Sequence, residues 1–329
     1  MFRPWGLLDW ALALSASQKW HFVGCLGTEY RSLAAWRAMK EPELLDAETL
    51  LRIRDVHHKP LAEQRIVERL AEFYAAGGKR ESLRDFALLD RIYELLGLAD
   101  VICGTSPHVV LDITSLPKRF FFILLKRLLL AGHVRNLIVT YTLPAGYETH
   151  EPLCEDPEPW GNLPTFLGAD ATTAQERLIV NVGFMPDGLQ EHLSSLTAEQ
   201  KVSLFIPFPA PIAAVRRSWE AVYRLENGRQ LDVFDEYRVD AKDMSEAFER
   251  ILTLTERGAH PATFAPFGPK TISAAMCIFA SLTDSPVFYA QPKAYHPDYT
   301  TGVAVIDGKP QIYAYWIKHD AEILYRRPG

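Results

Sequence analysis

The sequence has few cysteines and no pattern of metal-ligating or paired thiols. Its four cysteines lie far apart, without a Cys-x-x-Cys pair or zinc-ligand spacing. They are Cys25, Cys103, Cys154 and Cys277. We therefore expect reduced thiols in a cytoplasmic protein. The adjacent His57 and His58 do not share one helical face, so no metal site is predicted.

The sequence also lacks a charge excess and a long apolar run. Lys and Arg number 35 against 41 Asp and Glu, so a net charge of −6 gives no support for bulk binding to nucleic acid or membranes. Residues 1–14 are apolar but lack the basic start and the cleavage site of a secretion signal. The run 120–130 is too short to cross a bilayer and contains two basic residues. We expect no membrane association.

Familiar catalytic motifs are absent as well. The chain has no Gly-x-Ser-x-Gly elbow, no His-Glu-x-x-His, no P-loop and no G-x-G-x-x-G fingerprint. The sequence therefore lacks the commonest signatures of hydrolases, metalloproteases and dinucleotide-binding proteins. It does not indicate a cofactor.

Strand-like and helix-like segments alternate along the chain. This alternation predicts an α/β fold with one or more Rossmann-like, mainly parallel sheets. We expect a first half over 1–150 with a helix-rich insertion at about 41–98, and a Pro-rich linker or loop over 151–176. A second α/β half over 177–329 is expected to end in a hairpin around Asp307-Gly308. In this half we also expect a helix around 212–225 and a strand at 231–234.

Two segments show the same local pattern. In each, an apolar strand and a short turn precede Pro-Lys at a predicted helix start, at Pro117-Lys118 and at Pro269-Lys270. Pro is favoured at the first helical position, and the N–H groups and positive end of a helix beside a Lys suit an anion. Both helices lead to a further strand and Pro-x-x-Tyr. The pattern predicts either two tandem related halves or two βαβ units that follow the same turn rules.

Four groups of polar residues follow predicted strands, where parallel sheets bind ligands. The groups are Glu29, Arg31 and Ser32; Asp112, Thr114, Ser115 and Lys118; Gly268 and Lys270; and Gln291, Tyr295 and Tyr299. In the functional interpretation they bind a phosphate, a sugar hydroxyl or a base. In the structural interpretation they are a capped helix with a Glu–Arg pair, a helix cap, a stiff turn and a tyrosine-rich loop.

Four of these positions have more specific expectations. Asp112 lies in an otherwise apolar strand, where a carboxylate is costly, so we expect it to pair with Lys118 or to cap the helix. Gly268 is expected to permit a close backbone approach through a positive φ. Arg31 and Ser32 are expected to face the same cleft as Lys118.

The segment Asp112-Ile113-Thr114-Ser115-Leu116-Pro117-Lys118 resembles the ligand loop of the CARF and SAVED sensor families, in which Asn-x-Thr-Gly-Gly-Thr-Lys is common. Thr114 and Lys118 match that loop, whereas Asp112 replaces Asn and both glycines are missing. The resemblance implies a Rossmann-like domain that binds cyclic oligonucleotides in prokaryotic antiviral defence, with Thr114 and Lys118 at a phosphate. No effector nuclease domain is apparent in the sequence. The resemblance therefore implies a sensor, or a subunit whose effector is a separate protein.

The sequence thus predicts a sensor or regulatory subunit that binds a nucleotide-like or other phosphate-bearing ligand. One alternative is an enzyme that acts on such a ligand, with Asp112 or Glu29 as base and cationic residues stabilising negative charge. The other is an interaction subunit whose turns are purely structural.

Overall fold

The computed structural model describes residues 3–13, 18–57, 59–148, 153–168, 177–183, 200–209, 219–220, 223 and 234–326. The chain divides into two compact units. Unit 1 is Met1–Glu155 with Lys293–Leu324, and unit 2 is Asp156–Pro292 with Tyr325–Gly329. This division differs from the expected halves because the chain returns to unit 1 after residue 292.

Unit 1 contains an eight-stranded sheet, which has the order β1-β19-β6-β5-β2-β3-β4, with β20 paired to β19. Its strands are β1 (Trp5–Leu7), β2 (Trp20–Cys25), β3 (Leu45–Arg54), β4 (Leu83–Ala87), β5 (His108–Asp112), β6 (Asn136–Thr142), β19 (Ile312–His319) and β20 (Glu322–Ile323). Strands β6, β5, β2, β3 and β4 are mutually parallel, and β19 runs antiparallel to β6. Numbered from β2, the parallel strands have the order 3-2-1-4-5 of a doubly wound Rossmann-like sheet.

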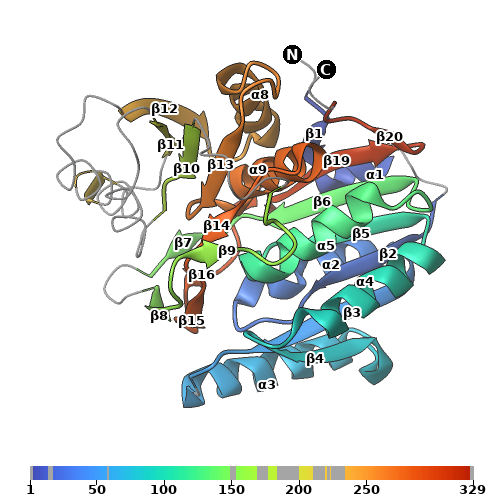
Figure 1. Ribbon diagram of the computed structural model, residues 1–329. Coiled ribbons are helices and arrows are strands. Elements are labelled where there is room, and N and C mark those ends of the chain that lie inside the picture. Colours follow the sequence, from blue (N-terminus) through green and yellow to red (C-terminus); the bar gives the residue numbers. More distant parts are fainter. Residues whose placement is uncertain are drawn as a thin grey trace. The chain divides into compact units, whose positions relative to one another are not determined.

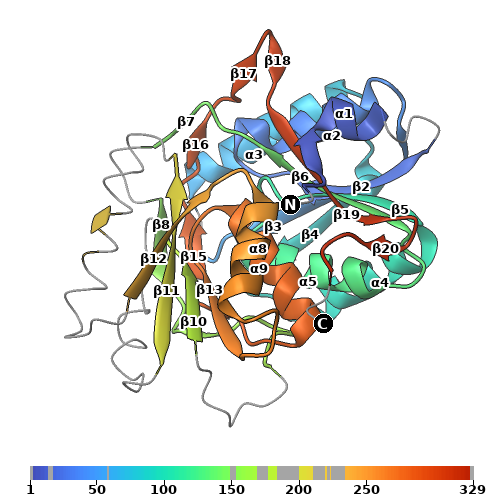
Figure 2. The same cartoon turned by 90° about the horizontal axis from the view of Figure 1, so that it is seen from above.

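Helices cover both faces of the unit 1 sheet (Figures 1 and 2). They are α1 (Leu8–Ala13), α2 (Ala34–Lys40), α3 (Pro60–Ala75), α4 (Ile92–Thr105) and α5 (Lys118–Leu130), with short 3₁₀ turns η1 (Tyr30–Leu33) and η2 (Arg80–Ser82). In Figure 2, α1, α2 and α3 lie on one face and α4 and α5 on the other. Because both faces are buried, the central strands are continuous apolar runs.

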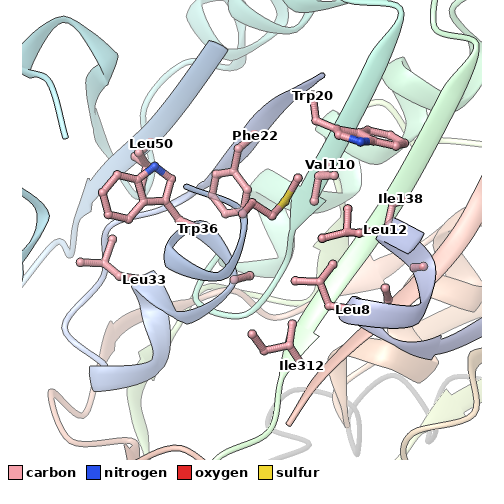
Figure 3. Close-up of a cluster of buried hydrophobic side chains, with 14 of the residues drawn as sticks. Leu8, Leu12, Trp20, Phe22, Leu33, Trp36, Leu50, Val110, Ile138 and Ile312 are labelled. Atoms are coloured by element: carbon pink, nitrogen blue, oxygen red, sulfur yellow. The ribbon is translucent and has the colours of Figure 1, made fainter. Parts of the chain in front are cut away.

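A cluster of large side chains fills the layer between α1, α2 and the sheet (Figure 3). Trp36 of α2 lies beside Phe22 and Leu50, and Leu8 and Leu12 of α1 approach the strands on the other side of the cluster. All five side chains are at most 8% exposed. The apolar pattern of these helices therefore faces the sheet, as amphipathic helices do in an α/β layer.

The expected helix-rich insertion at 41–98 is wrong for residues 45–54 and 83–87, which are strands of the sheet. Polar residues such as Glu48 obscure the strand pattern of β3. Yet Glu48 is largely buried and accepts hydrogen bonds from Trp36 Nε1 at 2.8 Å and Ser82 Oγ at 3.0 Å. The insertion does contain helix α3, and helix α4 begins at Ile92, after β4.

Unit 2 contains a four-stranded parallel sheet of order β12-β11-β10-β13. Its elements are β9 (Gly161–Asn162), β10 (Arg177–Asn181), β11 (Lys201–Phe208), β12 (Phe234–Asp240), α8 (Met244–Leu254), β13 (Ala262–Pro266), α9 (Lys270–Thr283) and β14 (Phe288–Tyr289). Numbered from β10, the order is 3-2-1-4. Val287 adds a parallel bridge to Phe264 of β13, in the place of a fifth strand.

The two Pro-Lys segments thus occupy the same place in the two sheets. Pro117 and Pro269 are the N-cap residues of α5 and α9, and Lys118 and Lys270 are the first helical residues. In each unit the helix connects the fourth strand to the next parallel segment, β6 or the bridge at Val287. The shared topology is compatible with a duplication and with common turn rules alike.

Parts of the predicted Pro-rich segment are packed within the units. Leu153 is buried in unit 1, and Leu163 and Phe166 are buried in unit 2. Hydrogen bonds join Leu163 N to Val287 O at 2.7 Å and Val287 N to Phe166 O at 3.1 Å. Residues 151, 152 and 169–176 lie outside the described part of the chain, as do most of the helix expected around 212–225 and of the strand expected at 231–234. Phe234 begins β12.

The expected hairpin after residue 302 is confirmed at its turn. Asp307 and Gly308 both have positive φ, 50° and 77°, between β17 (Val305–Ile306) and β18 (Lys309–Pro310). These dihedrals suit the tight turn of a two-residue hairpin. The following strand β19 belongs to the unit 1 sheet, between β6 and β1, rather than to the second half.

Leu50→Ala tests the assignment of β3 to the core. Leu50 is fully buried in the cluster of Figure 3, so its truncation is expected to lower the free energy of unfolding by about 2–5 kcal/mol. The matched control is Leu61→Ala on α3, where the side chain is 41% exposed and the loss should be small. Chemical denaturation measures both. Equal, small losses would contradict a buried strand at 45–54.

Candidate functional site

The polar residues at the carboxyl edge of the unit 1 sheet gather where the strand order reverses, between β2 and β5. The loops after these strands touch at Gly27, because a Cβ placed there would lie 3.1 Å from Ser115 Cβ. The Ser115 hydroxyl donates to Glu29 Oε1 at 3.4 Å. Ligands of open α/β sheets bind at such a reversal point. Glu29 and Ser115 therefore stand at the expected place for a ligand.

Glu29 forms a buried ion pair with Arg31. Arg31 Nη2 and Nε lie 2.9 and 3.0 Å from Glu29 Oε2, and Nη1 donates to the carbonyl of Thr142 at the end of β6. Nε also donates to Thr300 Oγ1 at 3.1 Å, and the Thr300 hydroxyl donates to Glu29. The Arg31 side chain is only 3% exposed. All three guanidinium nitrogens thus bind protein groups, which supports the structural interpretation of Arg31 over a phosphate contact.

Tyrosines surround this ion pair. The Arg31 guanidinium lies 5.1 Å from the ring centre of Tyr141. Burial alone lowers the pKa of Arg31, but Glu29, Tyr141 and Tyr147 more than offset it, so the pKa is raised above its usual value. Burial raises the pKa of Tyr299 and of Tyr147 well above the usual tyrosine value. Both phenols therefore keep their protons at neutral pH and can serve as hydrogen-bond donors.

Asp112 is held by threonine hydroxyls at the ends of β5 and β6. Its Oδ1 accepts from Thr114 Oγ1 at 2.6 Å and from Thr140 Oγ1 at 3.0 Å. The Thr114 hydroxyl in turn accepts from Thr142 N at 2.9 Å. The N-cap residue of α5 is Pro117 and not Asp112, and the expected pairing of Asp112 with Lys118 stays a prediction. Asp112 and Thr114 instead join two neighbouring strands.

A segment from Lys293 to Thr301, here called the strap, crosses the carboxyl edge of the same sheet. Lys293 O accepts from Val56 N at 2.9 Å, and Tyr295 N donates to Asp55 Oδ2 at 2.8 Å. Further along, Arg65 of α3 pairs with Asp298 at 3.0 Å. Thr300 contacts Arg31 and Glu29 as described above, and Thr301 O accepts from Ala145 N at 3.1 Å. The strap therefore lies over the edge where a ligand of this sheet would bind.

Sequence reasoning missed Asp55, which directly follows β3. Burial raises its pKa, while the Tyr295 N–H lowers it. An acidic residue at this position of a Rossmann-like sheet commonly binds a ribose. In this chain the strap occupies it. Asp55 could have been identified from the sequence if residues 45–54 had been recognised as a strand.

In unit 2 the loops after the first and fourth strands also meet at glycines. A Cβ on Gly268 would lie 2.2 Å from Asn181 Oδ1 and 2.3 Å from Val182 O, and one on Gly183 would lie 2.2 Å from Phe267 O. The expected positive φ at Gly268 is wrong, since its φ is not in that range. Gly268 is required because of the close approach itself. Its N–H donates to Asn181 O at 2.7 Å.

Asn181, at the end of β10, fixes the start of α9. Its Nδ2 donates to Pro269 O at 2.9 Å and to Ser273 Oγ at 3.0 Å, and the side chain is fully buried. Thr271 of the first helical turn donates to Ala241 O in the loop after β12. Sequence reasoning did not single out Asn181, although a lone polar residue at the end of an apolar strand is the same signal that identified Asp112.

Aromatic rings lie next to this loop. Trp160 stacks on Phe267, with ring centres 5.6 Å apart and 15° between the planes, and equally on Phe288 at 5.6 Å and 11°. Tyr289 contacts Phe267 at 5.5 Å. These rings stack on one another and form an aromatic cluster beside the loop.

The other predicted site residues have the following places. Lys118 is buried at the start of α5, and Lys270 is half-buried at the start of α9. Ser32 is fully buried in η1, so the cleft that it and Arg31 were expected to share with Lys118 stays a prediction. Gln291 is buried in unit 2 and donates to Pro292 O, whereas Tyr295 and Tyr299 belong to the strap of unit 1. The four expected groups thus separate into two sites.

The described ranges contain neither a cluster of metal ligands nor a membrane span. No group of three or more His, Cys, Asp or Glu side chains in the described ranges is placed to hold a metal ion. In the same ranges, no helix combines the length and apolar character needed to cross a bilayer.

Comparisons with known proteins leave the family open. No protein-family model matches this chain, and no curated protein matches it in sequence. Among solved structures, one from Pseudomonas aeruginosa UCBPP-PA14, whose name assigns it to the universal stress proteins, covers 84% of this chain and 94% of its own. The identity is 13% and the TM-score 0.24. The α/β assignment accordingly depends on the strand orders described above.

Glu29→Gln tests the buried ion pair. The neutral amide leaves the Arg31 guanidinium buried without its counter-charge, so we expect a loss of about 3–5 kcal/mol in the free energy of unfolding. Glu68→Gln is the control, because that carboxylate pairs with Arg65 at the surface, where little change is expected. Urea unfolding compares the two. Similar small effects would show that the pair does not hold the edge of unit 1 together.

Proposed function

We propose that the chain is a sensor or regulatory subunit that binds a nucleotide-like or other phosphate-bearing ligand, with the phosphate at the start of α9. One observation carries the proposal. The loops after the first and fourth strands of unit 2 meet at Gly183 and Gly268, directly before a helix that begins with Lys270. This is the reversal point of the sheet, where backbone, helix end and cation converge.

The chemistry of the α9 terminus favours an anion. The first turn has no acidic residue, and its N-cap residue is Pro269, whose side chain has no atom that could accept a hydrogen bond. The first N–H groups of a helix lack intrahelical acceptors, and the helix dipole adds positive potential at this end. Lys270 contributes a cation at the first helical position. Because Gly268 has no Cβ, its loop can pack closely against Asn181 and Val182. The stacked rings of Trp160 and Phe267 make the surroundings of this helix start apolar.

The corresponding edge of unit 1 is less suited to a phosphate. Arg31 is neutralised by Glu29, and the strap lies over the reversal point between β2 and β5. A ligand at this edge would meet the carboxylates of Glu29 and Asp55 and the strap itself. These groups suit hydroxyls better than phosphates, so unit 2 is the stronger phosphate site.

A defence role follows from the resemblance of residues 112–118 to the sensor loops of the CARF and SAVED families. In this proposal the chain senses a nucleotide signal and a separate effector protein responds. The loop takes the place in unit 1 that the Gly268 loop takes in unit 2, since Lys118 begins α5 as Lys270 begins α9. No second function is favoured by a specific observation.

A set of linear and cyclic nucleotides separates the alternatives. Thermal shift and calorimetry measure binding, and chromatography of the same mixtures measures turnover. Binding without turnover is expected. Turnover would favour the enzyme alternative, and neither binding nor turnover would favour a structural subunit.

Lys270→Ala tests the phosphate site directly. With a nucleotide found by that screen, we expect binding to weaken by about 1–3 kcal/mol, because a charge-assisted hydrogen bond is lost. The thermal melting temperature should change little. Lys79→Ala is the control, since Lys79 is exposed in unit 1. If Lys270→Ala lowers the melting temperature while affinity is unchanged, Lys270 is structural and the proposed site is wrong.

Gly268→Val tests the close approach at the same loop. The added side chain collides with Asn181 and Val182, so we expect weaker binding and a loss of about 1–3 kcal/mol in the free energy of unfolding. Gly132→Val is the control, because a Cβ there meets nothing within 4 Å. Wild-type stability and affinity in Gly268→Val would refute the tight loop contact.

A further inference from the structure

The strap supplies hydrogen-bond donors to two carboxylates at the carboxyl edge of unit 1. Tyr295 N donates to Asp55 Oδ2 at 2.8 Å. The Thr300 hydroxyl donates to Glu29 Oε2. Asp55 follows β3 and Glu29 follows β2, and these two strands are parallel neighbours in the sheet. The strap therefore places an N–H and an O–H where a ligand with two hydroxyls would place its own donors.

A tight turn brings these two contacts close together. The strap connects β15 (Pro292–Tyr295) with β16 (Thr300–Thr301) (Figure 1). Between them, Tyr299 N donates to His296 O at 3.0 Å, so residues 296–299 form a turn. The ends of such a turn lie within about 7 Å of each other. A small molecule of the size of a nucleoside can therefore reach both carboxylates that the strap covers.

Two buried hydroxyls beside the Glu29–Arg31 pair have no hydrogen-bond partner among the described residues. They are Ser32 Oγ, which follows Arg31 in the chain, and Thr142 Oγ1, on the residue whose carbonyl accepts from Arg31. Both side chains are 0% exposed. A buried hydroxyl without a partner is costly and is rare in folded proteins. This edge thus has hydrogen-bonding capacity that the closed chain does not use.

The outer attachment of the strap is an ion pair at the surface. Arg65 Nε and Nη2 lie 3.0 and 3.2 Å from the two carboxylate oxygens of Asp298, and the side chains are 33% and 36% exposed. Pairs this exposed contribute little to stability, because water and salt screen them. Ala294 and Pro297 of the strap are buried, which favours the closed position in the absence of a ligand. The strap is therefore closed at rest, with an attachment that is weak on its outer side.

We propose that the strap is an internal occupant of a second ligand site, and that a vicinal diol, as in the ribose of a nucleoside, displaces it from Asp55 and Glu29. Carboxylates accept hydrogen bonds from the diol as they accept them from the strap. Their negative charge disfavours a phosphate, so the sugar and not the phosphate end of a ligand belongs at this edge. The site is independent of the phosphate site proposed at α9.

Calorimetry on the whole protein tests the recognition of the diol. The probes are adenosine, 2′,3′-dideoxyadenosine, which lacks the diol, and D-ribose, which lacks the base. We expect adenosine to bind at least about tenfold more tightly than its dideoxy analogue, because two hydrogen bonds to charged acceptors are lost. D-ribose that binds as tightly as adenosine would identify a free sugar as the source of the diol and would also support the site.

Two substitutions loosen the strap but have opposite expected effects on the affinity for adenosine. Asp298→Asn removes the surface ion pair and leaves the acceptors in place, so binding should tighten about two- to fivefold. Asp55→Asn weakens the bond from Tyr295 N but also removes a charged acceptor of the diol, so binding should weaken at least about tenfold. If the strap were purely structural, the two substitutions would act alike.

Asp100→Asn is the matched control for the loss of a surface ion pair. Asp100 of α4 lies 3.8 Å from Arg127 of α5, on the face of the sheet opposite α3. Its replacement should leave the affinity for adenosine unchanged. Lys270→Ala should also leave it unchanged, so the phosphate site at α9 and this site can fail separately. Circular dichroism confirms that each variant is folded.

Hydrogen exchange of the wild type reports the position of the strap without any substitution. The amide of Val56 donates to Lys293 O in the closed state, so saturating adenosine should make it exchange faster, while the amides of β5 keep their rates. The proposal is overturned if adenosine and D-ribose bind neither the wild type nor Asp298→Asn, or if the dideoxy analogue binds as well as adenosine. It is also overturned if the two strap substitutions shift the affinity in the same direction, or if the exchange of Val56 does not change with ligand.

Discussion

Burial of both faces of the parallel strands is the constraint on which the rest of the structure depends. A strand covered by helices on each side has room only for apolar side chains along its length, so polar groups are confined to its ends. In unit 1, Glu29, Asp55 and Asp112 follow or end successive strands of the sheet. In unit 2, Asn181 ends β10 in the same way. The chemistry of this chain is therefore concentrated at the carboxyl edges of its two sheets.

The two carboxyl edges differ in how their polar groups are satisfied. In unit 1, polar groups are satisfied by one another and by the strap, so the edge is held together by an ion pair and shared hydroxyls. In unit 2, the corresponding contact is made by backbone and glycines, and the N-cap residue of the helix is Pro269, which has no capping side-chain atom. An edge closed by its own side chains serves stability, whereas an edge with backbone at its surface is suited to a ligand.

Local features of the sequence predicted much of the fold. Three features depend on residues close in sequence: the apolar strands before the two Pro-Lys segments, the helix starts at these segments and the Asp307-Gly308 turn. Each is present. β3 was missed because its charged residues find partners far away, as Glu48 does with Trp36 and Ser82. The strap was missed for the same reason: Thr300 bonds to Glu29 across 271 positions. Periodicity and turn rules use neighbouring residues only, so they cannot predict contacts between such distant positions.

The insertion of unit 2 between residues 155 and 293 has a consequence for the order of synthesis. Strand β19, which covers the outer side of β6, leaves the ribosome only after all of Asp156–Pro292. Until then β6 is an uncovered edge of apolar sequence, the kind of surface that pairs with other nascent chains. Residues 156–292, which are most of unit 2, are all available before β19 emerges. The sheet of unit 1, whose first strands are made earliest, is therefore completed only near the end of synthesis.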